Sequence, residues 1–165
     1  MSPRMAWRAI TSVLPKDAII SSDIGNNCAI GNAYPTFEQG RKYLAPGLFG
    51  PCGYGFPAIC GAKIAQPDVP VVGFAGDGAF GISMNEMVSV GRDEWPPITM
   101  IIFRNYQWGA EKRNTTLWFD DNFVGTELDT DVTYAGIAQQ CGVKGVQVDG
   151  MDALAEALDL SLIHI

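Results

Sequence analysis

The chain has 165 residues, enough for one domain with its own hydrophobic core, and 47% of its residues are apolar. Its net charge of −7, with no basic tract larger than Lys112-Arg113, argues against nucleic acid and anionic membranes as partners. No run approaches the ~18–20 apolar residues of a membrane span, and residues 1–14 lack the apolar core of a signal peptide. Because the four cysteines form no C-x-x-C pair, we expect free thiols and a cytoplasmic protein.

The predicted elements alternate between strands and helices along the chain. They are, in order, helix 3–14, strand 17–22, a helix ending at 65, strand 69–75, helix 83–91, strand 98–103, helix 134–141, strand 146–148 and helix 152–158. Loops are predicted over 23–27, over 34–47 and in the long stretch after Phe103. The strands are continuous apolar runs, which is typical of strands buried on both faces. The pattern predicts an α/β fold, a mostly parallel sheet with helices on both faces.

The segment 159–165 follows the last predicted helix without a cap or turn signal. We therefore expect residues 1–158 to form the domain, and 159–165 to be a non-native tail or the edge of a C-terminal truncation. The single histidine, His164, lies in this tail. The domain is thus expected to work without a histidine.

A glycine-rich segment, Gly76-Asp77-Gly78-Ala79-Phe80-Gly81, lies between a predicted strand and a predicted helix. It matches the G-x-G-x-x-G pattern of dinucleotide-binding folds, and a simple turn capped by an Asp would look similar. The dinucleotide fold needs an acid at the end of the next strand, but that strand ends in Phe103-Arg104-Asn105. The carboxylate of Asp77 would also repel a pyrophosphate unless a cation lay between them. These two points disfavour a dinucleotide site.

A cation site accounts for both strand ends. Asp77 and Asn105 follow successive parallel strands, so their side chains are expected to lie side by side. Carboxylate and amide oxygens are hard ligands that suit Mg²⁺. Gly76 and Gly78 let the backbone approach a ligand closely, and the helix that follows offers N–H groups to a diphosphate.

Gly76-Asp77-Gly78, followed one crossover later by Asn105, resembles the motif of thiamine diphosphate (TPP) enzymes, which begins GDG and ends in Asn-Asn. Arg104 stands here in place of the first Asn. The resemblance extends in order over nearly the whole chain and implies the TPP-binding fold, with TPP and Mg²⁺ as cofactors. It also implies that Asp77, Asn105 and the backbone carbonyl of Gln107 hold the metal.

The resemblance implies roles for further residues. The carbonyl of Gly50 would contact the aminopyrimidine of the cofactor, and Cys52 stands where the family has a bulkier aliphatic wedge that bends it. Asn26 and Asn27 match the loop that touches the diphosphate. The predicted cofactor-binding residues are Asn26, Asn27, Gly50, Cys52, Gly76, Asp77, Gly78, Ala79, Asn105, Gln107, Trp108 and Gly109.

Within the TPP enzymes, four segments look most like the sulfoacetaldehyde acetyltransferases. These segments are 23–27, 50–57, 105–114 and 118–127. The resemblance implies a transferase of taurine and sulfonate metabolism that converts sulfoacetaldehyde and phosphate into acetyl phosphate and sulfite. Arg104, Lys112 and Arg113 are candidates for holding these anions, with solvated surface charges as the alternative. Trp108, Trp118 and Phe119 are candidates for walling the site, with packing inside the domain as the alternative.

In that family an activating Glu lies on a pyrimidine-binding domain of the partner subunit, and the sequence contains no such domain. We therefore expect no catalytic residue in this chain, no turnover by the chain alone, and a homo-oligomer when full length. Two alternatives stay open. One is another TPP carboligase or decarboxylase, such as an acetolactate synthase, and the other is an incomplete fragment that only binds the cofactor.

Overall fold

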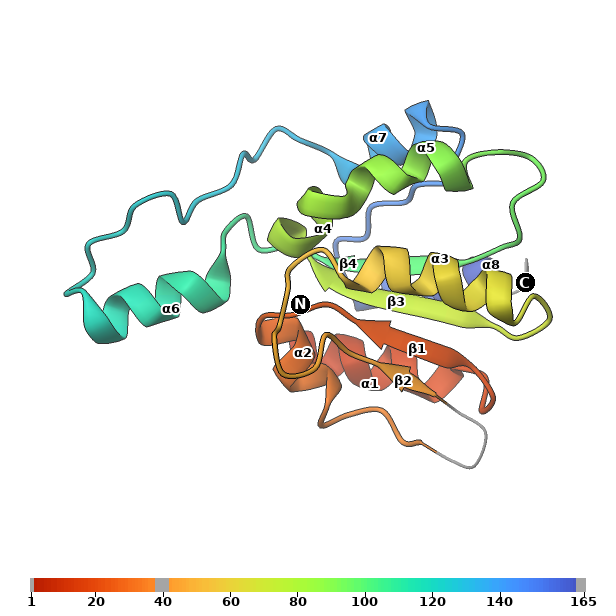
Figure 1. The fold of residues 1–165 in the computed structure, drawn as a ribbon, viewed down its shortest axis with the longest axis horizontal. Coiled ribbons are helices and arrows are strands. Elements are labelled where there is room, and N and C mark those ends of the chain that lie inside the picture. Colours follow the sequence, from red (N-terminus) through yellow and green to blue (C-terminus); the bar gives the residue numbers. More distant parts are fainter. Residues whose placement is uncertain (1, 38–41, 163–165) are drawn as a thin grey trace.

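The computed structural model describes residues 2–37 and 42–162 and contains a parallel sheet with the strand order β2-β1-β3-β4. The strands are β1 (Ile19–Ser22), β2 (Tyr43–Leu44), β3 (Val71–Gly76) and β4 (Thr99–Phe103). From β1 the chain moves outward to β2, then returns past β1 to build β3 and β4 on its other side (Figure 1). The order of the strands therefore reverses between β1 and β3.

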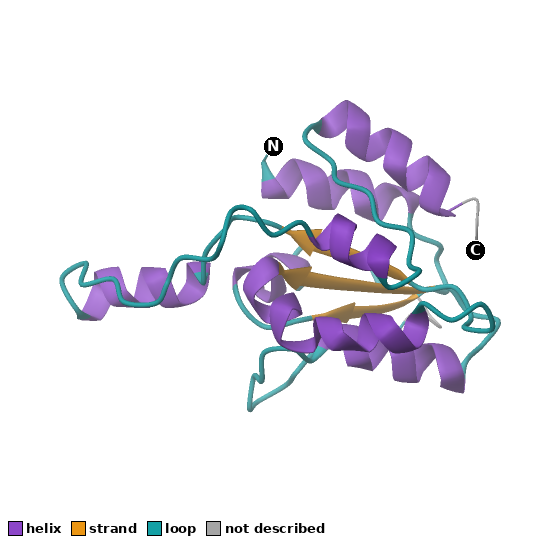
Figure 2. Cartoon of the chain, turned by 90° about the horizontal axis from the view of Figure 1, so that it is seen from above, coloured by secondary structure: helices purple, strands orange, loops and turns teal. Residues whose placement is uncertain are grey.

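Helices cover both faces of this sheet (Figure 2). Alternate strand residues point to opposite faces, so Ile20 and Phe74 belong to one core cluster while Ile19 and Ala75 belong to the other. The first cluster is covered by α1 (Pro3–Val13) and α8 (Met151–Leu162). The second is covered by α3 (Gly55–Ala65), α4 (Asp77–Ser83), α5 (Met87–Val90) and α7 (Tyr134–Gln140). The predicted α/β class and the placement of helices are confirmed.

Several element boundaries differ from the prediction. The predicted loop at 23–27 gives way to α2 (Asn26–Gly31), and the irregular stretch 34–47 contains the short β2. The helix expected to begin at Ser83 begins at Asp77 and continues through a 3-10 turn (η1, Met84–Glu86) into α5. Because α4 starts directly after β3, the GDG segment forms the first turn of a helix.

The C-terminal third shows the largest differences. The predicted long loop contains α6 (Gly109–Trp118), which extends away from the sheet and returns through an irregular segment (Figures 1 and 2). The strand predicted at 146–148 is wrong, because this stretch has no regular structure. Helix α8 runs past Leu158 to Leu162, and His164 lies outside the described residues.

Strand β4 lies at one side of the described sheet, where β3 is its one partner strand. All five of its residues, Thr99 to Phe103, are half-buried. Among the helices described, none combines the length and apolar character needed to cross a membrane.

Candidate functional site

The candidate site lies where three parallel strands end. Asp23 follows β1, Asp77 follows β3, and Asn105 follows β4 after one intervening residue. In open α/β sheets, ligands bind outside the carboxyl ends of the strands at the point where the strand order reverses. That point lies between β1 and β3 here, so the fold places these three polar residues at the expected binding edge.

Asp77 organises the loop that follows β4. Its side chain is 2% exposed, and its Oδ2 accepts hydrogen bonds from the backbone N–H groups of Asn105 (3.1 Å) and Tyr106 (2.7 Å). Its Oδ1 accepts from the N–H of Gly78 at 3.1 Å. Tyr106 adopts a left-handed backbone conformation (φ 59°), which a residue with a side chain rarely takes and which brings both loop N–H groups toward Asp77. The carboxylate thus holds a strained loop in place.

Two oxygens, Asp77 Oδ1 and the backbone oxygen of Gln107, lie close to the same terminal amide atom of Asn105. The position of Asn105 Oδ1 lies 3.2 Å from Asp77 Oδ1 and 2.9 Å from the backbone oxygen of Gln107. An oxygen gains no hydrogen bond from two other oxygens, so the amide either turns its NH₂ toward them or shares a cation with them. Adjacent ligands of an octahedral Mg²⁺, at 2.0–2.1 Å from the metal, lie about 3 Å apart. The observed spacing fits that octahedral edge.

This oxygen set differs from a cluster of ionisable ligands. Among the described residues, no three His, Cys, Asp or Glu side chains lie close enough to hold a metal together. One carboxylate, one amide and one carbonyl carry a single formal charge. Such a set suits a hard cation that keeps other positions for phosphate oxygens and water.

Gly109 allows two amide side chains to meet at the start of α6. A Cβ on this glycine would lie 2.8 Å from Asn105 Nδ2 and 3.2 Å from Asn26 Nδ2. Asn26 is exposed, whereas Asn27 is buried with its Nδ2 directed to Ser22 Oγ at 3.4 Å. Of the two predicted diphosphate contacts, the geometry therefore favours Asn26.

Gly78 and Trp108 form a close contact in the same region. A Cβ on Gly78 would lie 2.8 Å from Trp108 Cε3, so the indole packs directly on the glycine backbone. The backbone N–H of Trp108 also donates to the backbone oxygen of Thr126 at 2.8 Å. The second glycine of the GDG segment is thus packed against the loop that carries Asn105.

Tyr134 links α7 to the same strand end. Its hydroxyl donates to the backbone oxygen of Asp77 at 2.8 Å. Burial, followed by the charge of Asp77, raises the pKa of Tyr134, so the hydroxyl keeps its proton for this bond. The first turn of α4 is therefore held by α7 as well as by the loop after β4.

The loop between Gly50 and Gly55 is held by Asp23, a residue that the sequence did not single out. The Asp23 carboxylate is fully buried and accepts hydrogen bonds from the N–H groups of Gly53 (3.0 Å) and Gly55 (2.7 Å). Cys52 immediately precedes the first of these contacts and is exposed. Partial burial, followed by the charges of Asp23 and Glu111, raises the pKa of the Cys52 thiol.

Every residue predicted to bind the cofactor lines one cleft. Its volume of about 1420 Å³ exceeds the usual 300–1,000 Å³ of ligand pockets, because it continues along β4 to residues 143–150. The part that concerns the site is lined by Asn26, Asn27, Gly50, Cys52, Gly76, Asp77, Gly78, Ala79, Asn105, Gln107, Trp108 and Gly109. The structure thus brings the predicted set together at one edge of the sheet.

Comparison with known proteins identifies this arrangement. Residues 23–164 match the family described as the thiamine pyrophosphate enzyme, C-terminal TPP binding domain. The chain belongs to this family. The predicted TPP-binding fold and cofactor are thereby confirmed.

Individual relatives of this TPP-binding domain are similar over almost its full length. It is 74% identical over 162 residues to the sulfoacetaldehyde acetyltransferase of Roseovarius nubinhibens, an alignment that covers 98% of the chain and 27% of the relative. It is 78% identical over 158 residues to the probable sulfoacetaldehyde acetyltransferase of Rhizobium meliloti, covering 96% and 27%. The acetolactate synthase large subunit of Lactococcus lactis is 26% identical over 158 residues, covering 96% and 27%. The chain therefore spans about a quarter of the length of these relatives.

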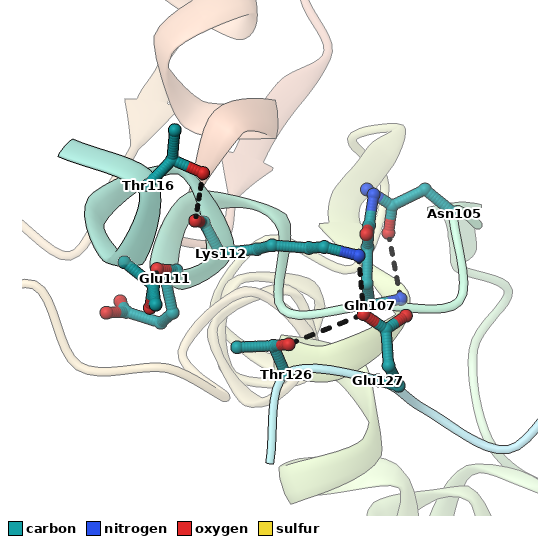
Figure 3. Close-up of polar contacts among 8 residues, drawn as sticks. Asn105, Gln107, Glu111, Lys112, Thr116, Thr126 and Glu127 are labelled. Atoms are coloured by element: carbon teal, nitrogen blue, oxygen red, sulfur yellow. Dashed lines mark hydrogen bonds and ion pairs between the residues drawn. The ribbon is translucent and has the colours of Figure 1, made fainter. Parts of the chain in front are cut away.

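Two of the three cationic substrate candidates in this TPP-binding domain are engaged within the chain. Arg104 donates to the backbone oxygens of Thr130 and Val132, and its guanidinium lies 4.3 Å from the centre of the Tyr106 ring. Lys112 pairs with Glu127 at 2.5 Å (Figure 3). Arg104 lines the cleft, but its guanidinium, like the ammonium group of Lys112, is bound to the returning segment after α6.

Arg113 also lines the cleft, but it has no hydrogen-bond or ion-pair partner among the described residues. It lies one helical turn after Gly109, on the face of α6 that meets Asn26 and Asn105. Trp118 and Phe119 are 75% and 66% exposed at the far end of α6 and do not line this cleft. The geometry therefore favours Arg113 and disfavours the two aromatic residues as part of the site.

Proposed function

We propose that this TPP-binding domain is part of an enzyme that transfers an acetyl group from sulfoacetaldehyde to phosphate and releases sulfite. The observation that carries the proposal is the meeting of the Asp77 carboxylate, the Asn105 amide and the Gln107 carbonyl at the binding edge, within a chain that is 74–78% identical to the named relatives. The lower identity of 26% to an acetolactate synthase makes that alternative the weaker one.

The residues of the chain fit a TPP·Mg²⁺ group. We assign Asp77 Oδ1, Asn105 Oδ1 and the Gln107 carbonyl as ligands of Mg²⁺, because their spacing matches an octahedral edge. Asn26, Asn105 Nδ2 and the start of α6 would supply donors to the diphosphate. When bound, TPP supplies the nucleophilic carbon and the electron sink, so the chain mainly has to bind and orient it.

Substrate recognition needs cations or N–H donors, because sulfonate and phosphate are both anions. We assign this role to Arg113, since Arg104 and Lys112 are engaged elsewhere. An activating Glu on a pyrimidine-binding domain, and a homo-oligomer that brings this domain to the site, complete the proposal. The free cysteines among the described residues support a reducing, cytoplasmic location.

The test of the cofactor site is a calorimetric titration of TPP into the chain with and without Mg²⁺. Asp77→Asn is compared with Asp68→Asn, which changes an exposed acid on the loop before β3. We expect binding to require Mg²⁺ and to weaken at least tenfold in Asp77→Asn, with Asp68→Asn unchanged. Binding that ignores Asp77 contradicts the metal assignment.

The test of the reaction uses the longer enzyme that carries this domain. With sulfoacetaldehyde and phosphate, we expect stoichiometric sulfite and acetyl phosphate, and with pyruvate no acetolactate. Arg113→Ala should raise the KM for one of the two anions more than it lowers kcat, because it removes a binding contact. Acetolactate formation without sulfite release would favour the alternative enzyme.

A further inference from the structure

Asp23 is a buried carboxylate with an unusual set of partners. It is fully buried, yet the ion pair found among the described residues joins Lys112 to Glu127 and does not involve it. Instead its Oδ1 accepts from the N–H groups of Ile24 (2.9 Å) and Gly53 (3.0 Å), and its Oδ2 accepts from Gly55 (2.7 Å). A buried carboxyl group is costly unless it is hydrogen-bonded, and these three donors satisfy Asp23 in this position.

These contacts determine the shape of the segment 50–55. Gly53 has a φ of +83°, a left-handed conformation that points its N–H back to Asp23. At Gly55 a Cβ would lie 3.0 Å from the Asp23 backbone nitrogen and 3.1 Å from Oδ2, so only glycine allows this approach. Gly55 also begins α3, and a carboxylate at a helix N-terminus is favoured by the helix dipole.

Both donors come directly after the part of the loop that faces the cleft. Gly53 immediately follows Cys52, and its N–H, like that of Gly55, donates to the Asp23 carboxylate. Gly50 and Cys52 both line the cleft. Their positions relative to β1 therefore depend on a side chain that itself lies out of reach of a ligand.

Asp77 provides a direct comparison at the end of β3. Each of the two aspartates follows a strand, is buried, and binds backbone N–H groups of a loop distant in sequence. Asp77 Oδ1 also lies 3.2 Å from the side-chain amide of Asn105, whereas the contacts of the Asp23 carboxylate are with backbone N–H groups. The chemistry of Asp23 is thus that of a residue that shapes a loop rather than one that binds a cation.

We propose that Asp23 is a positioning residue, which holds the loop 50–55 so that the Gly50 carbonyl and the Cys52 side chain meet the cofactor. The inference rests on the proposed function for the identity of the cofactor. The holding of the loop by Asp23 can be tested without any cofactor.

The perturbation is Asp23→Asn, which keeps the size of the side chain but turns one acceptor oxygen into an NH₂ donor facing an N–H group. Asp68→Asn is the control for loss of one negative charge. In the chain without cofactor, we expect the amide protons of Gly53 and Gly55 to exchange about tenfold faster or more in Asp23→Asn only, as measured by NMR. Unchanged exchange at both glycines would overturn the role of Asp23.

A second readout reports on Cys52. Loss of the Asp23 charge should lower the pH at which Cys52 becomes reactive toward iodoacetamide, whereas the profile of Cys60 should stay the same, as resolved by peptide mass spectrometry. A merely destabilised protein would instead expose both thiols together. If Asp23→Asn does not fold, amide exchange is compared within the unmodified chain. The amides of Gly53 and Gly55 should then exchange more slowly than that of Gly47, whose surroundings are open. Equal exchange at all three would contradict the proposal.

Titration with TPP tests the positioning role of Asp23 separately from the proposed cofactor site. Weaker TPP binding in Asp23→Asn, together with the loosened loop, supports the positioning role. A loosened loop with unchanged TPP affinity refutes that role and leaves the proposed function intact. Failure of the unmodified chain to bind TPP at all, with the loop still dependent on Asp23, counts against the cofactor site and not against the loop contacts.

Discussion

Replacing Gly78 with Ala tests whether the GDG segment is a tightly packed element or only a flexible turn. Gly78 is the second residue of α4, where alanine would normally favour the helix by up to about 1 kcal/mol. In this structure the added Cβ would lie 2.8 Å from Trp108 Cε3, whereas carbon atoms in ordinary contact lie about 3.5–4.0 Å apart. The indole must therefore move by about 0.7 Å or more.

Overpacking of this kind costs about 1–3 kcal/mol, which exceeds the gain in helix propensity. We expect Gly78→Ala to lower the free energy of unfolding by about 1–2 kcal/mol. For a chain of this length, that corresponds to a fall in Tm of roughly 2–8 °C. The displaced Trp108 should also carry Gln107 and Gly109 with it, so Mg²⁺-dependent TPP binding should weaken.

The assay is thermal and urea unfolding of Gly78→Ala beside Gly61→Ala. Gly61 lies inside α3 with nothing within 4 Å of its added Cβ, so there alanine should stabilise by about 0.5–1 kcal/mol. A Trp108→Ala background removes the clash and should make Gly78→Ala neutral or stabilising, which a double-mutant cycle would show. If Gly78→Ala alone raises the free energy of unfolding as much as Gly61→Ala does, the inferred clash with Trp108 is wrong.

Two further predictions concern titrating groups. The hydrogen bond from Lys112 holds the pKa of Glu127 below its ordinary value of 4.5, so its contribution to stability is present above that pH and is lost as the pH falls through the lowered pKa. The difference in free energy of unfolding between the unmodified chain and Glu127→Gln should therefore vanish in acid, and a difference that persists at pH 2 would contradict this account. Burial raises the pKa of Cys60 to about 11, so roughly one thiol in a thousand is ionised at pH 8. Alkylation of Cys60 should be slow at pH 8 and rise about tenfold per pH unit toward pH 11; a rate equal to that of exposed Cys52 at pH 8 would show that its burial is wrong.

The sheet was predictable because its evidence is local. Buried parallel strands such as Val71–Gly76 are continuous apolar runs, and their order along the chain determines which polar residues reach the binding edge. Asp77 and Asn105 could be paired from sequence for this reason alone. The GDG helix start was missed because glycine is a poor helix former, and the contacts of Trp108 and Tyr134 that support α4 come from distant segments.

Elements without a buried face lack the apolar periodicity from which secondary structure is predicted. Helix α6 contains no buried residue, so its sequence shows no apolar stripe, and the prediction of a loop there was wrong. The segment 146–148 gave the opposite error, because its two valines suggest a strand but no neighbouring strand pairs with it. The hydrogen bonds of Asp23 could not be predicted for a different reason. Its partners in the loop 50–55 are backbone groups, 30 and 32 residues away in the sequence.

Strand β4 has a consequence for how the protein behaves in concentrated solution. Its sequence, Thr-Met-Ile-Ile-Phe, is apolar, and β3 is its one partner among the described strands. It carries no charge, proline or bulge of the kind that stops one sheet from adding to another. Among the edge strands of the described sheet, the five-residue β4 is thus better suited to pairing with another molecule than the two-residue β2. Association through β4 would interfere with a calorimetric titration at high protein concentration. The titration should therefore be repeated at several protein concentrations.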